Sequence, residues 1–176
     1  MTTTPPIYPA RSAYPVLVLV RGLPGTGKST LAGLFSPSAP TLAADDYFMV
    51  EGEYRFDPNF LGQAHAVCQH RTREALPLFP AVVVANTFSQ RWELEPYFTI
   101  AREHNAKVHV IDLFDAGLDD AALAARNVHG VPQHTIAAMR ARWEHDWRTA
   151  DPRPPWERPA EVAKSHAHFA ATRGHR

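Results

Sequence analysis

A short segment near the start of the chain has the residue types and spacing that bind phosphate. Gly22-Leu23-Pro24-Gly25-Thr26-Gly27-Lys28-Ser29 matches the pattern G-x-x-x-x-G-K-[ST] at every fixed position. Glycines allow the backbone to curl, so that successive N–H groups face inward toward phosphate oxygens. The lysine supplies a positive charge for the β- and γ-phosphates, and the serine hydroxyl is a ligand for Mg²⁺. The segment therefore predicts a binding site for a nucleoside triphosphate and Mg²⁺.

We expect the nucleotide contacts to come from this loop and from the residue that follows it. The predicted contacts are Gly22, Pro24, Gly25, Thr26, Gly27, Lys28, Ser29 and Thr30. Ser29 is also the predicted metal ligand, and Thr30 is placed to touch the α-phosphate. A chance glycine turn is the alternative explanation. The context argues against it, because the loop follows the pattern of a buried strand and opens the pattern of a helix.

Two adjacent acids, Asp45 and Asp46, follow the next short strand pattern. Ligands of parallel α/β sheets gather at the carboxyl ends of the strands, so these acids should face the same crevice as the glycine loop. A kinase needs a carboxylate that orients the acceptor hydroxyl and accepts its proton. We expect Asp45 to have this catalytic role, with Asp46 at the substrate or at metal-bound water. Alternatively, Asp46 caps the following segment, or neither acid is functional.

The buried run Ala81–Ala85 continues into Asn86 and Thr87 rather than into an acid. NTPases that hydrolyse their nucleotide commonly carry a carboxylate at such a strand end. Its absence here favours transfer of the phosphoryl group to a bound hydroxyl over plain hydrolysis. Another acid, Asp112, ends a later strand pattern and is as consistent with a strand-end cap or a surface acid as with a metal ligand.

The elements that must position these residues alternate along the chain between strand and helix patterns. Strand patterns occupy Val16–Arg21, Thr41–Ala44, Ala81–Ala85 and Lys107–Leu113. Helix patterns occupy Lys28–Phe35, Asn59–Leu76, Trp92–His104, Asp119–Asn127 and Thr135–Trp147. Because this alternation is typical of a parallel sheet covered by helices, it predicts an α/β fold.

The length and composition are those of one globular domain. With 176 residues a second full domain would be cramped, and a net charge of zero gives no support to a large basic surface for nucleic acid. We expect a flexible lead at residues 1–15, a kinase domain at 16–150 and a proline-rich extension at 151–176. The single cysteine, Cys68, excludes an internal disulfide, and no apolar run is long enough to span a bilayer. These features predict a cytoplasmic protein without a membrane partner.

Five segments, in this order, resemble the phage-type polynucleotide 5′-hydroxyl kinase family. They are RGLPGTGKSTLA (Arg21–Ala32), DDYF (Asp45–Phe48), YRFDP (Tyr54–Pro58), ANTFSQRWELEPY (Ala85–Tyr97) and RNVHGVPQHTIAAM (Arg126–Met139). The resemblance implies a P-loop kinase fold with a five-stranded parallel sheet, flanking helices and a helical lid. It implies that Asp45 is the general base and that Arg126, on the lid, meets the nucleotide phosphates and stabilises the transferring group. A solvated helix face is the alternative for Arg126.

The chain departs from this family on the acceptor side. The family usually reads Asp-Asn-Thr-Asn where this sequence reads Ala85-Asn86-Thr87-Phe88, and an arginine that meets a substrate phosphate is replaced by Phe48. Without that arginine, the chain lacks a group that would meet the phosphate of the acceptor. These changes therefore argue against a 3′-phosphorylated or polynucleotide acceptor. The predicted substrate contacts are Asp46, Tyr47, Asn86 and Thr87.

Aromatic residues are frequent in the same segments. They are Tyr47, Phe48, Tyr54, Phe56, Phe88, Trp92 and Tyr97. Such rings can stack on a base or sugar of the acceptor. More often, they form the core or the wall of a pocket.

Together these features predict a Mg²⁺-dependent kinase that uses ATP or GTP and phosphorylates a hydroxyl. The expected acceptor is the 5′-hydroxyl of a polynucleotide or nucleotide. A small-molecule kinase acting on a nucleoside, sugar or antibiotic is one alternative, favoured by Phe48 and the zero net charge. A nucleotide-binding regulatory module with little turnover is another, favoured by Ala85 and the proline-rich tail.

Overall fold

The structure is a computed structural model that describes residues 14–35 and 39–145. The described chain divides into two compact units, each treated by itself. The sheet unit contains residues 14–21, 27–35, 39–86 and 96–113, and the helical unit contains residues 22–26, 87–95 and 114–145. Most of the predicted lead, the predicted extension at 151–176 and the predicted end of the last helix at Trp147 lie outside the described residues.

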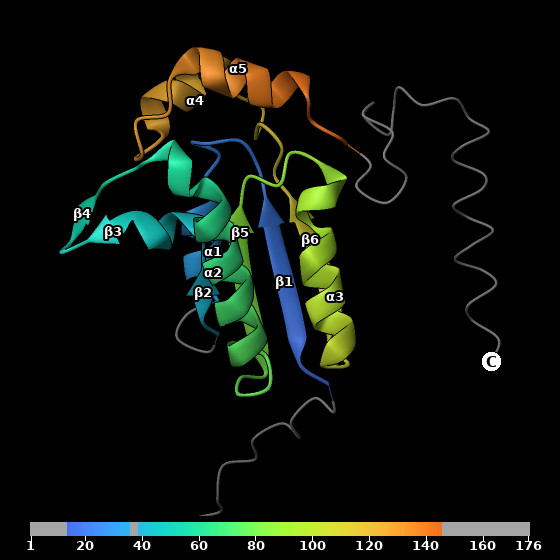
Figure 1. The fold of residues 1–176 in the computed structure, drawn as a ribbon. Helices are drawn as coiled ribbons and strands as arrows, with labels where there is room; N and C mark the ends of the chain where they lie inside the picture. Colours follow the sequence, from blue (N-terminus) through green and yellow to red (C-terminus); the bar gives the residue numbers. More distant parts are fainter. Residues whose placement is uncertain (1–13, 36–38, 146–176) are drawn as a thin grey trace, which may run out of the picture. The chain divides into compact units, whose positions relative to one another are not determined.

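Four parallel strands form the sheet of the sheet unit, in the order β2-β5-β1-β6 (Figure 1). The strands are β1 (Val16–Arg21), β2 (Thr41–Leu42), β5 (Ala81–Asn86) and β6 (Lys107–Asp112). The two central strands, β1 and β5, are the continuous runs of valine and leucine, as expected for strands covered on both faces. Because the strands are parallel, their carboxyl ends lie along one edge, where Arg21 is in register with Asn86 and with Asp112.

The five-stranded sheet implied by the family resemblance is wrong for the described residues, which hold four strands in this sheet. The sequence contains four runs with strand character before residue 114. The residues beyond that point are rich in alanine, with breaks at Gly117 and Gly130, and they form helices instead. Alanine favours helices and is depleted in strands, so no fifth run was available there.

Helices cover both faces of the sheet. They are α1 (Lys28–Gly33), α2 (Leu61–Ala75) and α3 (Glu95–Glu103). On one face, Val18 and Val83 pack with Ala32 of α1 in a buried cluster. On the other face, α2 and α3 lie side by side in front of the sheet (Figure 1). The buried positions of α2 recur every four residues, at Ala64, Cys68 and Thr72, which is the spacing of one helical face.

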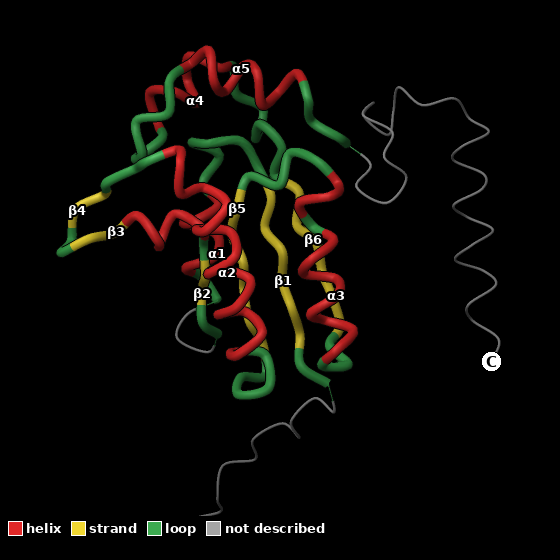
Figure 2. The backbone as a smooth tube through the Cα atoms, in the orientation of Figure 1, coloured by secondary structure: helices red, strands yellow, loops and turns green. Residues whose placement is uncertain are grey.

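A short hairpin that the sequence patterns do not predict follows a single 3-10 turn, η1 (Ala44–Phe48). Its strands are β3 (Met49–Val50) and β4 (Glu53–Tyr54), drawn in yellow at the left of Figure 2. The connecting residues Glu51 and Gly52 have φ angles of 53° and 85°. These angles are those of a type I′ turn, the two-residue turn with positive φ at both positions, and Gly52 is the sequence signal for it. A second 3-10 turn, η2 (Pro58–Phe60), leads into α2.

The helical unit contains α4 (Asp120–Arg126), α5 (Gln133–Ala141) and the 3-10 turn η3 (Arg91–Glu93). Its core consists of Leu23, Leu123, Ile136 and Trp143. The break predicted at residues 130–132 is present. It is closed by Asn127, whose Oδ1 accepts from the Val131 N–H at 2.7 Å and whose Nδ2 donates to the Ala124 carbonyl at 2.7 Å. Both predicted helices are present. The second begins at Gln133 and ends at Ala141, so its predicted continuation through residues 142–145 is wrong.

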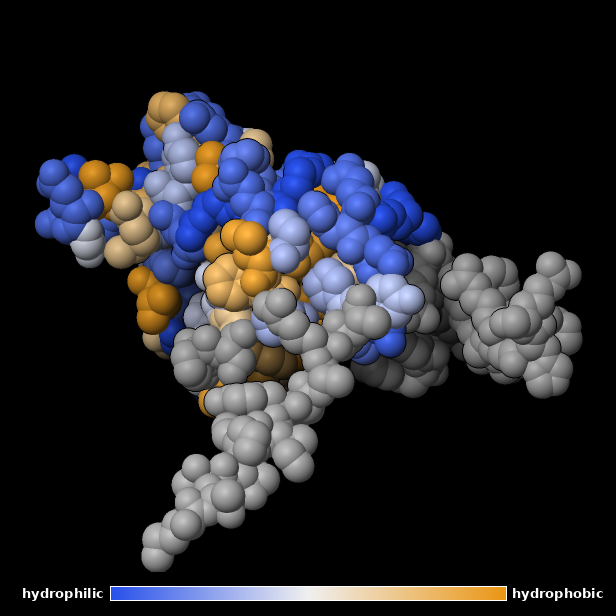
Figure 3. Space-filling model, turned by 90° about the horizontal axis from the view of Figure 1, so that it is seen from below, coloured by the Kyte–Doolittle hydropathy of each residue, from blue (hydrophilic) through white to orange (hydrophobic). Residues whose placement is uncertain are grey.

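Hydrophobic residues remain on the surface beside the hairpin. Large apolar side chains that are exposed there are Met49, Val50, Phe56, Phe60 and Leu61. Seen from below, orange residues occur among blue ones, including at the projecting left side of the molecule (Figure 3). No helix among the described residues is both long and apolar enough to cross a membrane.

Candidate active site

The glycine loop joins β1 to α1 and is curled as the motif requires. The Leu23 N–H donates to the Phe114 carbonyl at 2.8 Å, and the Thr26 hydroxyl donates back to the Leu23 carbonyl at 2.9 Å. Gly25 and Gly27 have φ angles of 84° and 90°, a region that only glycine adopts at little cost. The buried side chain of Thr26 therefore supports the turn itself, and its nucleotide contact stays a prediction.

Helix α4 packs directly on this loop within the helical unit. A Cβ atom added at Gly25 would lie 2.3 Å from the carbonyl oxygen of Leu123, so the two backbones touch where Gly25 has no side chain. Arg126 is the last residue of α4, one turn beyond Leu123. Its side chain is exposed, and none of the described residues forms an ion pair with it. The loop and the predicted lid arginine therefore belong to one packed unit.

Lys28 is the first residue of α1 and lies within the electrostatic reach of Asp45. Burial lowers the pKa of the Lys28 ammonium from its ordinary 10.5 to about 8, and the negative charge of Asp45 opposes this shift. Ser29 and Thr30 follow on the first turn of α1, and both are exposed. The sheet unit thus holds both the predicted phosphate-binding cation and the predicted general base, and the two interact electrostatically.

Asp45 itself is held by a tyrosine that sequence reasoning did not assign to the site. The Tyr54 hydroxyl donates to Oδ1 of Asp45 at 2.9 Å. Burial, together with the negative charge of Asp45, raises the pKa of Tyr54, so the phenol keeps the proton that it donates. The hairpin turn at Gly52 returns Tyr54 to the end of β2. Recognising that turn would have indicated the pairing.

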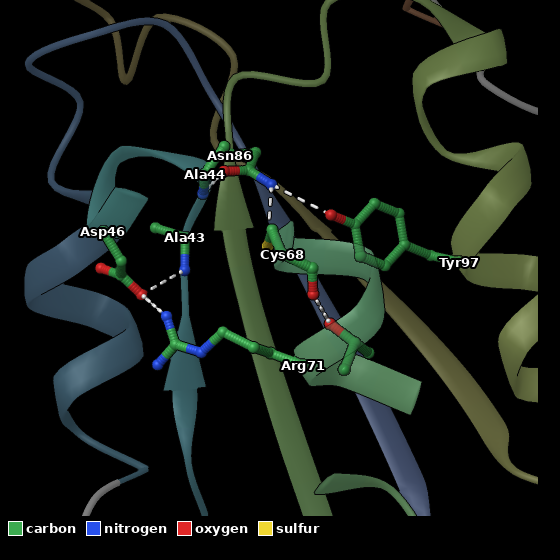
Figure 4. Close-up of polar contacts among 8 residues, drawn as sticks. Ala43, Ala44, Asp46, Cys68, Arg71, Asn86 and Tyr97 are labelled. Carbon is green, nitrogen blue, oxygen red and sulfur yellow. Dashed lines mark hydrogen bonds and ion pairs between the residues drawn. The ribbon is translucent and has the colours of Figure 1, made fainter. Parts of the chain in front are cut away.

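Asp46 caps the start of η1, which is the alternative to a functional role that the sequence left open for this acid. Its Oδ2 accepts from the Ala43 N–H at 3.0 Å and pairs with Nη1 of Arg71 at 3.2 Å (Figure 4). The side chain thereby ties the start of η1 to α2. A direct contact of Asp46 with the substrate stays a prediction.

Asn86, at the end of β5, holds the other side of the same turn. Its Oδ1 accepts from the Ala44 N–H at 2.8 Å, and its Nδ2 points toward the Tyr97 hydroxyl at 3.4 Å and the Cys68 sulfur at 3.8 Å (Figure 4). Its side chain is buried. Burial also raises the pKa of the Cys68 thiol, which fits an inert buried cysteine. The predicted substrate contact of Asn86 stays a prediction, and the side chain also positions the turn that carries Asp45.

We expect Asn86→Ala to lower the free energy of unfolding by about 2 kcal/mol, because the buried Ala44 N–H and Tyr97 hydroxyl lose a partner. Urea unfolding followed by circular dichroism measures the change. Asn59→Ala removes an exposed amide and serves as the control, with an expected change within about 0.5 kcal/mol. Equal stability of the two variants would contradict the positioning role of Asn86.

The remaining predicted substrate contacts are Thr87 and Tyr47, which interact in the structure through a backbone carbonyl and through an aromatic ring, respectively. The Thr87 carbonyl accepts from the Gly22 N–H at 3.2 Å, so Thr87 supports the glycine loop through its backbone. Tyr47 packs edge-on against Phe48, with ring centroids 5.4 Å apart. Of the seven aromatic residues in the motif segments, Phe48, Phe88 and Tyr97 are buried, whereas Phe56 and Trp92 are exposed. The predicted core role is therefore confirmed for Phe48, Phe88 and Tyr97, and stacking on an acceptor stays a prediction.

Asp112 forms an ion pair at the end of its strand. Its Oδ2 lies 3.5 Å from Nη1 of Arg21, a fully buried guanidinium at the end of the neighbouring strand β1. The strand-end explanation for this acid therefore holds. The sequence did not indicate that Arg21 is buried, since it reads there as the polar end of a strand.

The described residues fit a nucleoside triphosphate with Mg²⁺. The loop glycines have the positive φ angles that turn N–H groups inward, Lys28 is cationic at neutral pH, and Ser29 is exposed beside it. No cluster of three or more His, Cys, Asp or Glu residues that could hold a metal occurs within residues 14–35 and 39–145. Mg²⁺ needs no such cluster, because it keeps several waters and binds through the phosphates.

A parallel sheet whose first strand leads through a glycine loop to a helix, with a separate helical pair after the last strand, defines the P-loop fold of the kinase type. Residues 17–145 match the family model of an AAA domain, and the chain belongs to this family. The predicted P-loop kinase fold, with helices flanking a parallel sheet, is therefore confirmed.

One curated relative is NEDD4-binding protein 2 from Homo sapiens. It is 39% identical over 138 residues, which cover 73% of this chain and 8% of that protein. The chain therefore spans a small part of the length of this relative.

Solved structures show the same fold. A chain of the Pnkp1/Rnl/Hen1 RNA repair complex has a TM-score of 0.60 and 19% identity, covering 76% of this chain and 45% of that one. A gluconokinase from Sinorhizobium meliloti 1021 has a TM-score of 0.53 and 15% identity, covering 92% of this chain and 99% of that one. At these identities the likeness concerns the fold alone.

Proposed function

We propose that the chain is a Mg²⁺-dependent kinase that transfers the γ-phosphoryl group of ATP or GTP to a hydroxyl, the 5′-hydroxyl of a polynucleotide or nucleotide. The observation that supports it best is the Asp45 carboxylate, which accepts from the Tyr54 hydroxyl at 2.9 Å on the same unit as Lys28. Its negative charge opposes the burial that lowers the pKa of Lys28. A kinase needs a cation at the phosphates and a carboxylate at the acceptor, close to one another.

In this proposal the acceptor oxygen forms a bond to the γ-phosphorus, the bond to the β-phosphate oxygen breaks, and the nucleoside diphosphate leaves. Asp45 accepts the proton of the acceptor hydroxyl, and Tyr54 holds the carboxylate in place. Lys28 and Arg126 bind the phosphates, and Ser29 is the protein ligand of Mg²⁺. The metal, when bound, neutralises charge that develops on the phosphoryl oxygens.

The choice of acceptor rests on the ordered motifs from Asp45 to Met139 and on the fold likeness to a chain of an RNA repair complex. A small-molecule kinase is the second candidate. It is supported by the fold likeness to a gluconokinase and by Phe48, which is buried and contributes no charge. We further infer a cytoplasmic location from the single cysteine, since a reducing compartment suits a protein without disulfides.

Incubation of the full chain with γ-labelled ATP, Mg²⁺ and a panel of acceptors tests the proposal. The panel contains an oligonucleotide with a 5′-hydroxyl, a nucleoside and gluconate, and we expect label in the oligonucleotide. Binding of a polynucleotide should weaken steeply with salt, whereas binding of a neutral acceptor should hardly change. Label in gluconate alone would favour the small-molecule kinase. Label in no acceptor would contradict kinase activity and favour a regulatory module.

The lowered pKa of Lys28 predicts a pH dependence of nucleotide binding. Only the charged lysine attracts the triphosphate, so affinity should fall as the pH rises through about 8. Without nucleotide, the unfolded state binds this proton more tightly than the folded state, so the free energy of unfolding should rise between pH 8 and 10.5. Calorimetric titration and urea unfolding measure the two effects. Lys28→Met should remove both, whereas Lys107→Met, at an exposed lysine, should leave both unchanged.

A further inference from the structure

A pocket lies beside the candidate active site, on the sheet unit, between η1, the hairpin and η2. Its volume is about 280 Å³, and its lining residues are Tyr47, Phe48, Val50, Arg55, Asp57 and Phe60. Pockets for whole drug-sized ligands measure roughly 300–1,000 Å³. This one is therefore large enough for a single ring system but not for an extended ligand.

Three aromatic residues, Tyr47, Phe48 and Phe60, line this pocket. Phe48 is buried and is supported from outside the lining by the rings of Phe56 and Tyr54, 5.0 Å and 6.1 Å away, centroid to centroid. Phe60 remains 45% exposed. Rings on a rigid buried support that stay in contact with water are typical of a surface that stacks on a flat ligand.

The pocket is joined to the proposed general base by short contacts. Tyr47 and Phe48 belong to the same turn as Asp45. Tyr54, which donates to Asp45, is also stacked on Phe56 at 6.5 Å with an interplanar angle of 13°. A ligand in the pocket would therefore be part of the molecule whose hydroxyl meets Asp45.

One cation lines the pocket. The Arg55 N–H donates to the Phe48 carbonyl at 2.8 Å, which fixes the backbone of Arg55 beside the rings. Its guanidinium pairs with the Glu53 carboxylate at 2.9 Å, and both side chains are more than half exposed. Such an exposed ion pair contributes little stability, so the guanidinium can exchange its partner for a phosphate.

We propose that this pocket binds the nucleobase of the phosphoryl acceptor, with Arg55 directed to an acceptor phosphate. The inference rests on the proposed function and adds to it the site that recognises the base of the acceptor. A base has two flat faces for rings and a polar edge, and a nucleotide adds the anion that suits Arg55. A sugar acid such as gluconate has an anion but no flat face, so the rings would gain nothing from it.

Fluorescence of a short oligonucleotide with 2-aminopurine at its 5′ end tests the proposal without any turnover. Stacking quenches this fluorescence, so we expect the full chain to quench it. Phe60→Leu keeps apolar volume but removes the ring of an exposed lining residue, and it should weaken binding about tenfold. Phe60→Trp should restore it. Phe79→Leu is the matched control, because Phe79 is an exposed ring outside the pocket, and it should bind like the wild type.

Three outcomes would overturn the base-binding pocket: no quenching by the wild type, equal binding by Phe60→Leu and the wild type, or equal affinity for an oligonucleotide whose 5′ nucleotide lacks its base. Quenching that depends on Phe60 in a chain that transfers no label would retain the pocket and reject the kinase. Competition by adenosine 3′-monophosphate would show that one nucleotide suffices. Competition by longer strands alone would show that the pocket takes a nucleic-acid end, and either result supports base binding.

Discussion

Asp45→Asn should lower the rate of phosphoryl transfer about a thousandfold while nucleotide binding persists. The amide has the shape of the carboxylate and can still accept from the Tyr54 hydroxyl, so the local geometry should survive. It cannot accept the proton of an acceptor hydroxyl. The loss should therefore fall on kcat, measured with γ-labelled ATP. The Kd for ATP, measured by calorimetry well below pH 8 where Lys28 is charged in both proteins, should not change.

The same variant has a second signature that a merely structural role would not produce. Asp45 raises the pKa of Lys28, so its neutralisation should move the fall of nucleotide affinity to a pH below about 8. Glu103→Gln is the charge-matched control, since this exposed acid pairs with Arg73 away from the site, and it should change neither value. Wild-type turnover in Asp45→Asn would reject Asp45 as the general base.

Asp46→Asn separates the two neighbouring acids. The structure ties Asp46 to the Ala43 N–H and to Arg71, so its replacement should loosen the turn without removing a proton acceptor. Its effect on kcat should therefore be much smaller than that of Asp45→Asn. A comparable loss in both variants would instead support the direct substrate contact that the sequence predicts for Asp46.

The parts of the fold that the sequence predicts are those that depend on local pattern. Val16–Arg21 is predicted to the residue, because a continuous β-branched run between loops has few alternatives to a buried strand. The curl of the glycine loop follows from Gly25 and Gly27, whose positive φ angles the motif anticipates. The hairpin is not predicted because each of its strands has only two residues. Such strands are too short to show the alternation of apolar and polar residues that identifies a strand.

The parts of the site that the sequence does not predict depend on residues that meet only after folding. Asn86 and Ala44 are 42 positions apart, and their hydrogen bond exists because β5 lies next to β2 in the sheet. Sequence reasoning assigns Asn86 to the substrate, because it belongs to the segment that resembles the acceptor-side motif of the kinase family. The sequence cannot show that Oδ1 of Asn86 already accepts a hydrogen bond from the Ala44 N–H. Tyr54 is missed for a different reason: the hairpin that returns it to Asp45, nine positions earlier, is not predicted.

Gly25→Ala should abolish most of the activity through a purely steric effect. The new Cβ would lie 2.3 Å from the Leu123 carbonyl oxygen, far inside contact distance, and the φ of 84° is itself strained for alanine. Either the loop or α4 must move. A displacement of about 1 Å can lower catalysis about a hundredfold. Strain and overpacking together should reduce the free energy of unfolding by about 3 kcal/mol.

Alanine substitutions at two further glycines separate the two causes of this loss, backbone strain and the steric clash with α4. Gly27 has a φ of 90° but open space around its Cβ position, so Gly27→Ala adds strain alone and should cost about 1–2 kcal/mol. Gly33, in α1, has neither obstacle, and Gly33→Ala should change stability by less than about 1 kcal/mol. Urea unfolding and nucleotide titration of the three variants should therefore rank Gly25→Ala as the most damaging. If Gly27→Ala were equally damaging in both measurements, backbone strain would explain the loss, and the contact between the loop and α4 would not determine nucleotide binding.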